Sequence, residues 1–150
     1  MSLKYLNDEY KELLKVIGSL SRLFSERNIP HLNYRIAENI FCRSFKAQNL
    51  ARKDSSYDAT LDRIGIGLKT FSLTSDNSLE KVAEFNSISS SLRELKGKKL
   101  AIEVAKARNE RINFALRLYE VKEAIYHCVG RKEGVLEIFE NDYLQIDLGN

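Results

Sequence analysis

Two oppositely charged residues fall close together in the stretch "YDATLDRIGIGLKTF" of this sequence. The stretch is typical of a β-hairpin, because two runs of strand-forming residues flank Asp62-Arg63, a natural turn. With the turn there, Asp58 is expected opposite Gly67. Side chains alternate along a strand, so Asp58 and Lys69 should point to the same face. The spacing therefore predicts a carboxylate and an ammonium group side by side.

Hydrolysis of a phosphodiester bond uses groups of these two kinds. Carboxylates hold Mg²⁺, which polarises the phosphate and lowers the pKa of a bound water. A lysine beside them stabilises the attacking hydroxide or the charge that develops in the transition state. One carboxylate is not enough, so a second acid must lie near the metal. The simpler alternative is that Asp58 and Lys69 form a surface ion pair, which would contribute little.

The two faces of the predicted hairpin differ in character. Glycine inside a strand often marks the close approach of a ligand or another backbone, so Gly65 and Gly67 are expected to bare the charged face. The opposite face is apolar and belongs on a hydrophobic core. The residues of that apolar face are Ala59, Leu61, Ile64, Ile66 and Leu68.

The residues of this hairpin, Asp58 followed by "GLKT" at 67 to 70, resemble the paired-strand motif of the PD-(D/E)xK nuclease superfamily. That superfamily includes the type II restriction endonucleases. Its members carry an Asp on one strand and a (D/E)xK triplet on the next, and an upstream helix often adds a Glu. Asp58 takes the Asp place, Lys69 the lysine place and Glu38 the upstream Glu place. The resemblance covers roughly residues 31 to 95.

Two positions depart from the pattern of the superfamily. Gly67 stands where the (D/E) acid is expected, and Tyr57 stands where a proline would precede Asp58. Some restriction endonucleases carry the missing acid on a following helix, a dozen or so residues past the lysine. Glu84 lies fifteen positions after Lys69, beside an apolar helix face, and could fill the space that Gly67 leaves.

The resemblance implies a Mg²⁺-dependent DNA endonuclease, or the catalytic part of one. Asp58 and Glu84 would bind the metal, and Lys69 would position or activate the hydrolytic water. Glu38 would assist the metal or the lysine. The substrate would be double-stranded DNA. A homodimer is implied as well, because a two-fold assembly suits the symmetric cutting of two strands, and the first helix is a candidate interface.

Each helix-borne acid also has a simpler interpretation. Glu38 could be a helix-surface charge paired with Arg35 or Arg43, and Glu84 could be an exposed charge paired with Lys81. Two rival functions therefore stay open. One is a catalytically inactive DNA-binding or protein-interaction domain on the same fold. The other is a helical interaction domain whose hairpin charges are incidental.

Basic residues gather just before the hairpin, and we expect them to approach the phosphate backbone of DNA. They are Arg43, Lys46, Arg52 and Lys53. A second basic group is formed by Lys96, Lys98 and Lys99. Solvated surface is the simpler interpretation of both groups. The formal net charge of +3 permits a nucleic-acid partner and does not demand one.

The length of 150 residues favours one domain with a real core, although the chain could be the N-terminal part of a longer protein. No apolar run is long enough to span a membrane, and "MSLKYLNDEY" lacks an apolar signal region, which favours the cytoplasm. Cys42 and Cys128 lack partners at zinc spacing and are expected to be reduced and buried. His127 is interpreted as a strand-surface residue.

Apolar periodicity predicts the elements that must position these side chains. Helices are expected over residues 3–27, 31–47, about 76 or 78 to 95, and about 100–120. Strands are expected over 57–61 and 64–73, and in the later runs "AIYHCVG", "GVLEIFE" and "DYLQIDL". Residues 48–56 are polar and predict a loop. The fold class is therefore α/β (α+β mixed), with helices flanking a mixed central sheet, and the resemblance implies a restriction-endonuclease-like core.

Overall fold

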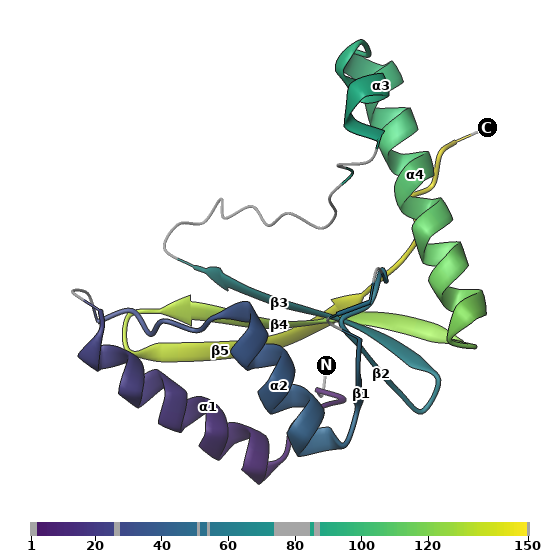
Figure 1. Cartoon of the computed structure of the whole chain (residues 1–150). Helices are drawn as coiled ribbons and strands as arrows, with labels where there is room; N and C mark the ends of the chain where they lie inside the picture. The colour runs from purple at the N-terminus through teal and green to yellow at the C-terminus, as the bar shows by residue number, and fades with distance from the viewer. Residues whose placement is uncertain are drawn as a thin grey trace.

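The computed structural model describes residues 3–25, 28–50, 52–53, 55–73, 85 and 88–149. Its centre is a five-stranded mixed sheet with the strand order β1-β2-β3-β4-β5 and helices beside it (Figure 1). The strands are β1 (Gln48–Asn49), β2 (Ala59–Leu61), β3 (Ile64–Ser72), β4 (Glu123–Lys132) and β5 (Val135–Asp142). Only the central pair, β3 and β4, is parallel. The predicted mixed class with flanking helices is confirmed.

Helices α1 (Asp8–Leu20) and α2 (Tyr34–Phe45) precede the sheet, and a short 3₁₀ turn, η1 (Ser21–Leu23), follows α1. Both helices are shorter than predicted, and they begin later because asparagine side chains cap their N-termini. The side chain of Asn7 accepts a hydrogen bond from the backbone of Tyr10, and that of Asn33 accepts one from Arg35. Lys46 ends α2 in the left-handed conformation, with φ of 55°.

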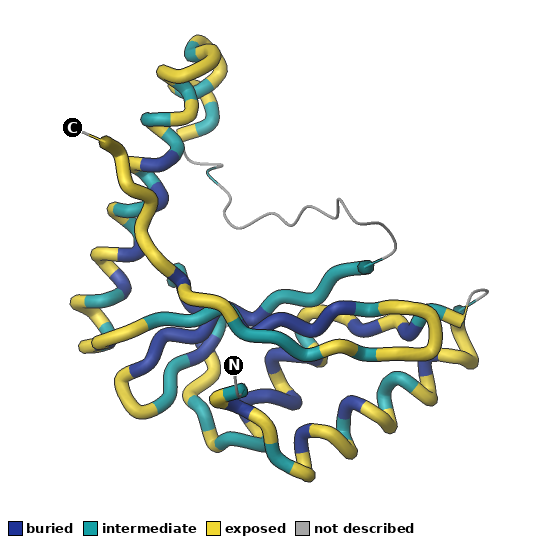
Figure 2. The backbone as a smooth tube through the Cα atoms, turned by 180° about the vertical axis from the view of Figure 1, so that it is seen from behind, coloured by how far each residue is buried: buried dark blue, intermediate teal, exposed yellow. Residues whose placement is uncertain are grey.

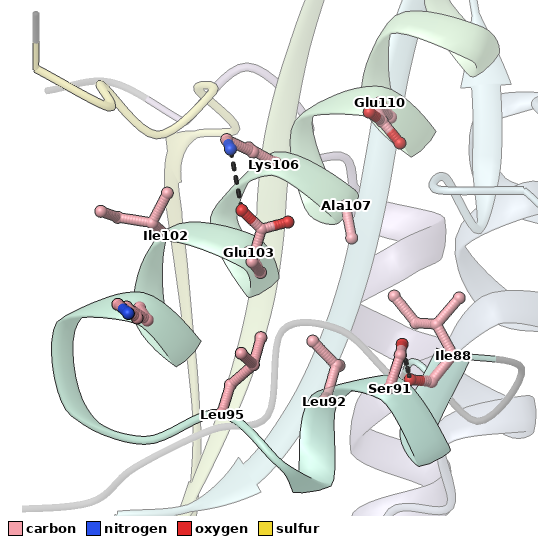
Figure 3. A pocket seen from close by; sticks show the side chains of 10 residues that line it. Ile88, Ser91, Leu92, Leu95, Ile102, Glu103, Lys106, Ala107 and Glu110 are labelled. Atoms are coloured by element: carbon pink, nitrogen blue, oxygen red, sulfur yellow. Dashed lines mark hydrogen bonds and ion pairs between the residues drawn. The ribbon is translucent and has the colours of Figure 1, made fainter.

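The crossover from β3 to β4 contains α3 (Ser89–Arg93) and α4 (Gly97–Leu118), as a parallel pair requires. Most of the helix predicted from about residue 76 lies outside the described residues. Gly97 begins α4 with φ of 55°. The α3 end of this pair stands away from the sheet (Figure 1). There Leu92 of α3 and Leu95, just after α3, help to line a groove of about 520 Å³ along α4 (Figure 3).

The core has two parts, one on each face of the sheet, and Figure 2 shows the buried strands between exposed outer surfaces. The first part joins α1 and α2 to the apolar face of the hairpin, so that predicted face is confirmed. The second part joins α4 to the other face through Leu50, Ile112 and Ala115 together with two tyrosines, Tyr57 and Tyr143. Within the described ranges, no helix has the length and apolar character needed to cross a bilayer.

Two predictions about irregular segments are wrong. Part of the expected loop over 48–56 forms β1, which pairs with β2. The run "DYLQIDL" is not a strand, because β5 ends at Asp142 and the following backbone bonds to side chains of α4. Arg108 donates to the carbonyl of Leu144 over 2.8 Å, and Asn109 bonds both backbone polar groups of Ile146. These contacts satisfy groups that a neighbouring strand would otherwise pair.

His127 is fully buried, so its predicted place on the strand surface is wrong. Its Nε2 lies 2.9 Å from the hydroxyl of Tyr10, and its Nδ1 lies 2.9 Å from Oε1 of Glu140. Burial lowers the pKa of this imidazole, against the opposing effect of Glu140. Neither Cys42 nor Cys128 forms a disulfide and both are buried, as predicted.

Candidate active site

The hairpin of β2 and β3 forms with the predicted turn. Asp62 and Arg63 have φ of 48° and 64°, the positive values that a two-residue type I′ turn requires. The register then places Leu61 against Ile64, and Ala59 against Ile66. β3 therefore lies at the centre of the sheet, with β2 on one side and β4 on the other.

Asp58 lies just before β2, next to the last residue pair of the β2–β3 ladder. Its backbone N–H donates to the carbonyl of Ile66 over 2.9 Å, and its carboxylate Oδ2 accepts from the backbone N–H of Leu68 over 2.8 Å. The predicted pairing of Asp58 with Gly67 is therefore not formed. The side chain instead takes up a backbone donor of β3, which fixes the carboxylate beside that strand.

Glu38 reaches the same place from α2. It is only 5% exposed, so the interpretation as a helix-surface charge is wrong, although its expected pairing with Arg35 is confirmed at 2.9 Å. Burial is the largest cause that raises the pKa of Glu38, and the nearby charge of Asp58 raises it further. Arg35 and Lys69 act in the opposite direction. The two carboxylates are therefore within electrostatic reach of each other.

Lys69 completes the group from β3. Its charge lowers the pKa of both Asp58 and Glu38, although burial keeps the pKa of Asp58 raised overall. Among the described residues it makes no ion pair within 4.0 Å with either carboxylate. Glu38, Asp58 and Lys69 thus lie within electrostatic range of one another, and in the described part of the chain no hydrogen bond or ion pair joins the lysine to either acid.

A divalent cation suits this group on chemical grounds. Carboxylates whose pKa is raised by burial, and in Glu38 also by the charge of Asp58, gain from a nearby positive charge. Mg²⁺ is usually held through one or two carboxylates, with water and substrate phosphate completing its shell, so Glu38 and Asp58 fit it. The described residues contain no cluster of three or more His, Cys, Asp or Glu side chains. Glu84 lies outside the described residues.

The two glycines of β3 face tyrosine rings instead of open space. A Cβ on Gly67 would lie 2.9 Å from Cδ1 of Tyr126 and 3.0 Å from Cε1 of Tyr143. A Cβ on Gly65 would lie 2.8 Å from three ring atoms of Tyr57. The expectation that glycine bares this face is therefore wrong. The space directly over Gly67, which was expected to receive Glu84, is filled by the two rings.

Sequence reasoning missed this tyrosine cluster. The rings of Tyr126 and Tyr143 stack at 4.0 Å, and Tyr57 meets Tyr143 edge to face at 5.5 Å. The guanidinium of Arg108 lies 5.1 Å from the centre of the Tyr143 ring and donates to the hydroxyl of Tyr126. Glycines two positions apart on one strand were the available signal, since they leave room for large rings as well as for ligands.

The basic residues predicted to contact DNA fall into two places. Arg52 and Lys53 line a surface depression of about 670 Å³, and the other residues of its lining are Arg35, Asn39 and Asn49. Arg43 and Lys46 are exposed at the end of α2 and do not line it. Arg43 is instead paired with Glu9 of α1 over 3.2 Å.

Comparison with known proteins found no matching family model, no matching curated protein and no matching solved structure. A functional assignment for this chain therefore depends on its residues and on their arrangement.

Proposed function

We propose that this chain is a Mg²⁺-dependent DNA endonuclease of the type II restriction kind, with a restriction-endonuclease-like core. In this proposal it acts in the cytoplasm as a homodimer on double-stranded DNA. The observation that carries the proposal is the group of Glu38, Asp58 and Lys69, which come from three segments. The charges of Asp58 and Lys69 both act on the pKa of Glu38, and the charge of Lys69 also lowers the pKa of Asp58. Two carboxylates and a lysine are the groups that phosphodiester hydrolysis uses.

The roles of the residues follow from their surroundings. Mg²⁺, when bound, supplies the positive charge that polarises the scissile phosphate. Asp58 would hold it, fixed in place by the N–H of Leu68, and Glu38 would add a second oxygen ligand from α2. Glu84 lies outside the described residues and stays a predicted further ligand, although the rings of Tyr126 and Tyr143 fill the space over Gly67 that it was expected to occupy. Lys69 would hold the attacking water and stabilise the charge that develops on the phosphate.

Plasmid cleavage tests the proposal. We expect the wild-type protein to convert supercoiled plasmid to nicked or linear DNA with Mg²⁺ and not with EDTA. Lys69→Ala should lose on the order of a hundredfold or more of this rate, as expected for loss of one transition-state contact. Lys98→Ala, which removes an exposed lysine of α4, is the matched control and should cut like the wild type. Equal cutting by wild type and Lys69→Ala would exclude the assigned role of Lys69.

One observation favours the rival function, a catalytically inactive DNA-binding or protein-interaction domain. The tyrosine rings over Gly67 occupy the place where the PD-(D/E)xK pattern has its second acid. Such a domain would bind duplex DNA, or a protein, and leave the plasmid intact at every Mg²⁺ concentration. The same cleavage assay, run beside a duplex-binding assay, therefore separates the two functions.

A further inference from the structure

The depression beside α2 is built from three separate segments. Arg35 and Asn39 come from α2, Asn49 comes from β1, and Arg52 and Lys53 come from the segment after β1. Its described lining contains three cationic side chains and two amides, and none of these residues carries a carboxylate. A surface of this kind suits a phosphate, because Arg binds phosphate oxygens in a bidentate manner and amides donate additional hydrogen bonds.

The walls of the depression are held by contacts of their own. Asn49 donates to the side chain of Asn39 over 3.2 Å, which joins β1 to α2. The backbone N–H of Lys53 donates to the carbonyl of Leu50, which is fully buried in the second part of the core. The ammonium of Lys53 lies 5.8 Å from the centre of the Tyr119 ring. Asn39, Asn49 and Lys53 are therefore held in place by these contacts, which lowers the entropic cost of binding an anion.

Arg35 belongs to the depression and to the candidate active site. Its guanidinium lines the depression and is also paired with Glu38 over 2.9 Å. The side chain of Arg35 is 44% exposed, whereas that of Glu38 is only 6% exposed. An anion that arrives from solvent would therefore meet the arginine before the glutamate. Phosphate and Glu38 would then compete for the same guanidinium.

We propose that this depression binds a backbone phosphate of duplex DNA, and that the phosphate draws Arg35 away from Glu38. This inference rests on the proposed nuclease function. Once Arg35 turns to the phosphate, the carboxylates of Glu38 and Asp58 lose a compensating cation, and a divalent cation can take that place. DNA and metal would then strengthen each other's binding, and by linkage the effect is the same in both directions.

The first test measures duplex binding in EDTA, where no cleavage can occur. A short fluorescein-labelled duplex is titrated with each protein and followed by fluorescence anisotropy. The double variant Arg52→Gln/Lys53→Gln should bind at least about tenfold more weakly and lower the salt slope by about one, because one phosphate contact is lost. The matched control Lys98→Gln/Lys99→Gln removes the same charge from the start of α4 and should change the affinity by less than about twofold.

Equal losses in the two double variants would overturn the phosphate site, because binding would then follow net charge alone. No loss in Arg52→Gln/Lys53→Gln would overturn it as well. This test does not depend on catalysis. A protein that never cuts plasmid but loses binding through Arg52 and Lys53 would refute the proposed nuclease and keep the phosphate site.

The second test addresses the exchange of Arg35. Ca²⁺ takes oxygen ligands as Mg²⁺ does, so duplex affinity is measured with Ca²⁺ and with EDTA. Ca²⁺ should tighten duplex binding by the wild type several-fold. In Arg35→Gln that factor should fall towards one, because Glu38 has already lost its partner. Arg43→Gln is the matched control on the same helix, since it breaks the ion pair with Glu9, and it should keep the wild-type factor. An unchanged factor in Arg35→Gln would overturn the exchange.

Discussion

Burial decides the chemistry of the two acids at the residue scale. The pKa of Asp58 is raised chiefly by burial, against the effects of Lys69, the Leu68 N–H and Arg35. The folded-state pKa of this acid therefore lies above its value in the unfolded chain. Below the unfolded-state value both states are protonated and there is no penalty. As pH rises through the folded-state value, ionisation in the folded protein costs stability.

Asp58→Asn should therefore raise the free energy of unfolding at neutral pH. The amide oxygen can still accept the hydrogen bond from Leu68, and the buried charge is gone. The gain should vanish below a pH of about 4, where Asp is protonated in the unfolded chain too. Urea unfolding at the two pH values measures it.

Asp8→Asn is the control, because Asp8 is an exposed acid in the first turn of α1. It should be neutral or slightly destabilising, since an acid there favours the helix dipole. A lower free energy of unfolding in Asp58→Asn at neutral pH would contradict the inference that the buried, ionised carboxylate of Asp58 destabilises the fold.

Part of the candidate site could be predicted from the sequence. Glu38, Asp58 and Lys69 were predicted from the resemblance to a nuclease motif, and in the structure they lie within electrostatic range of one another. The burial of Glu38 could not be predicted, nor could the position of Arg35, which lines the depression and pairs with Glu38. Both depend on how α2 packs against the hairpin, and helical periodicity specifies a face without specifying its depth in the protein.

At the scale of the element, tyrosine rings pack against the two glycines of β3. The rings of Tyr126 and Tyr143 lie against β3 at Gly67, and the ring of Tyr57 lies against Gly65. These rings also join β3 to α4, because Tyr57 and Tyr143 pack in the same cluster as residues of that helix. Any side chain at 67 must therefore displace part of that contact.

Gly67→Ala should lower the free energy of unfolding by about 1–3 kcal/mol, the usual cost of overpacking. Gly18→Ala is the matched control, since its Cβ would lie 3.5 Å from Leu136 in ordinary contact. It should instead gain about 0.5–1 kcal/mol, because alanine favours a helix interior. Thermal or urea unfolding compares the two.

Gly67→Asp, which restores the acid of the motif, should be destabilised too and should not cut plasmid faster than the wild type. A faster Gly67→Asp enzyme would show that the rings yield to a carboxylate.

Elements with strong local signals were predicted, and elements that depend on distant partners were not. The Asp62-Arg63 turn fixed the hairpin register by local chemistry alone. The run after Asp142 has strand composition, but its backbone is paired by Arg108 and Asn109 of α4. No local pattern reports such a partner. β1 was not predicted for the same reason, because it is two residues long and is defined by its pairing with β2.

An apolar stripe on the outer side of α1 and η1 matters at the scale of the whole molecule. It consists of Val16, Leu20, Leu23 and Phe24, which are 50%, 50%, 76% and 83% exposed. Their spacing places them along one helical face, where it continues into the 3₁₀ turn. Contiguous exposed apolar surface of this kind commonly marks an interaction site. The first helix is also the predicted candidate interface for the homodimer that the nuclease resemblance implies.

We expect the wild-type protein to run as a dimer of the 17.3 kDa chain in light scattering, and Leu23→Glu/Phe24→Glu to run as a monomer. Charges at both positions would be buried in the interface without partners, which is costly. Ile146→Glu/Leu148→Glu is the matched control, since these apolar residues are exposed in the segment after β5, and it should stay dimeric.

A dimer has two sites and can cut both strands in one encounter, so the wild-type protein should yield linear plasmid. The monomeric variant should accumulate nicked circles, and equal linear product from both proteins would refute the role of this stripe.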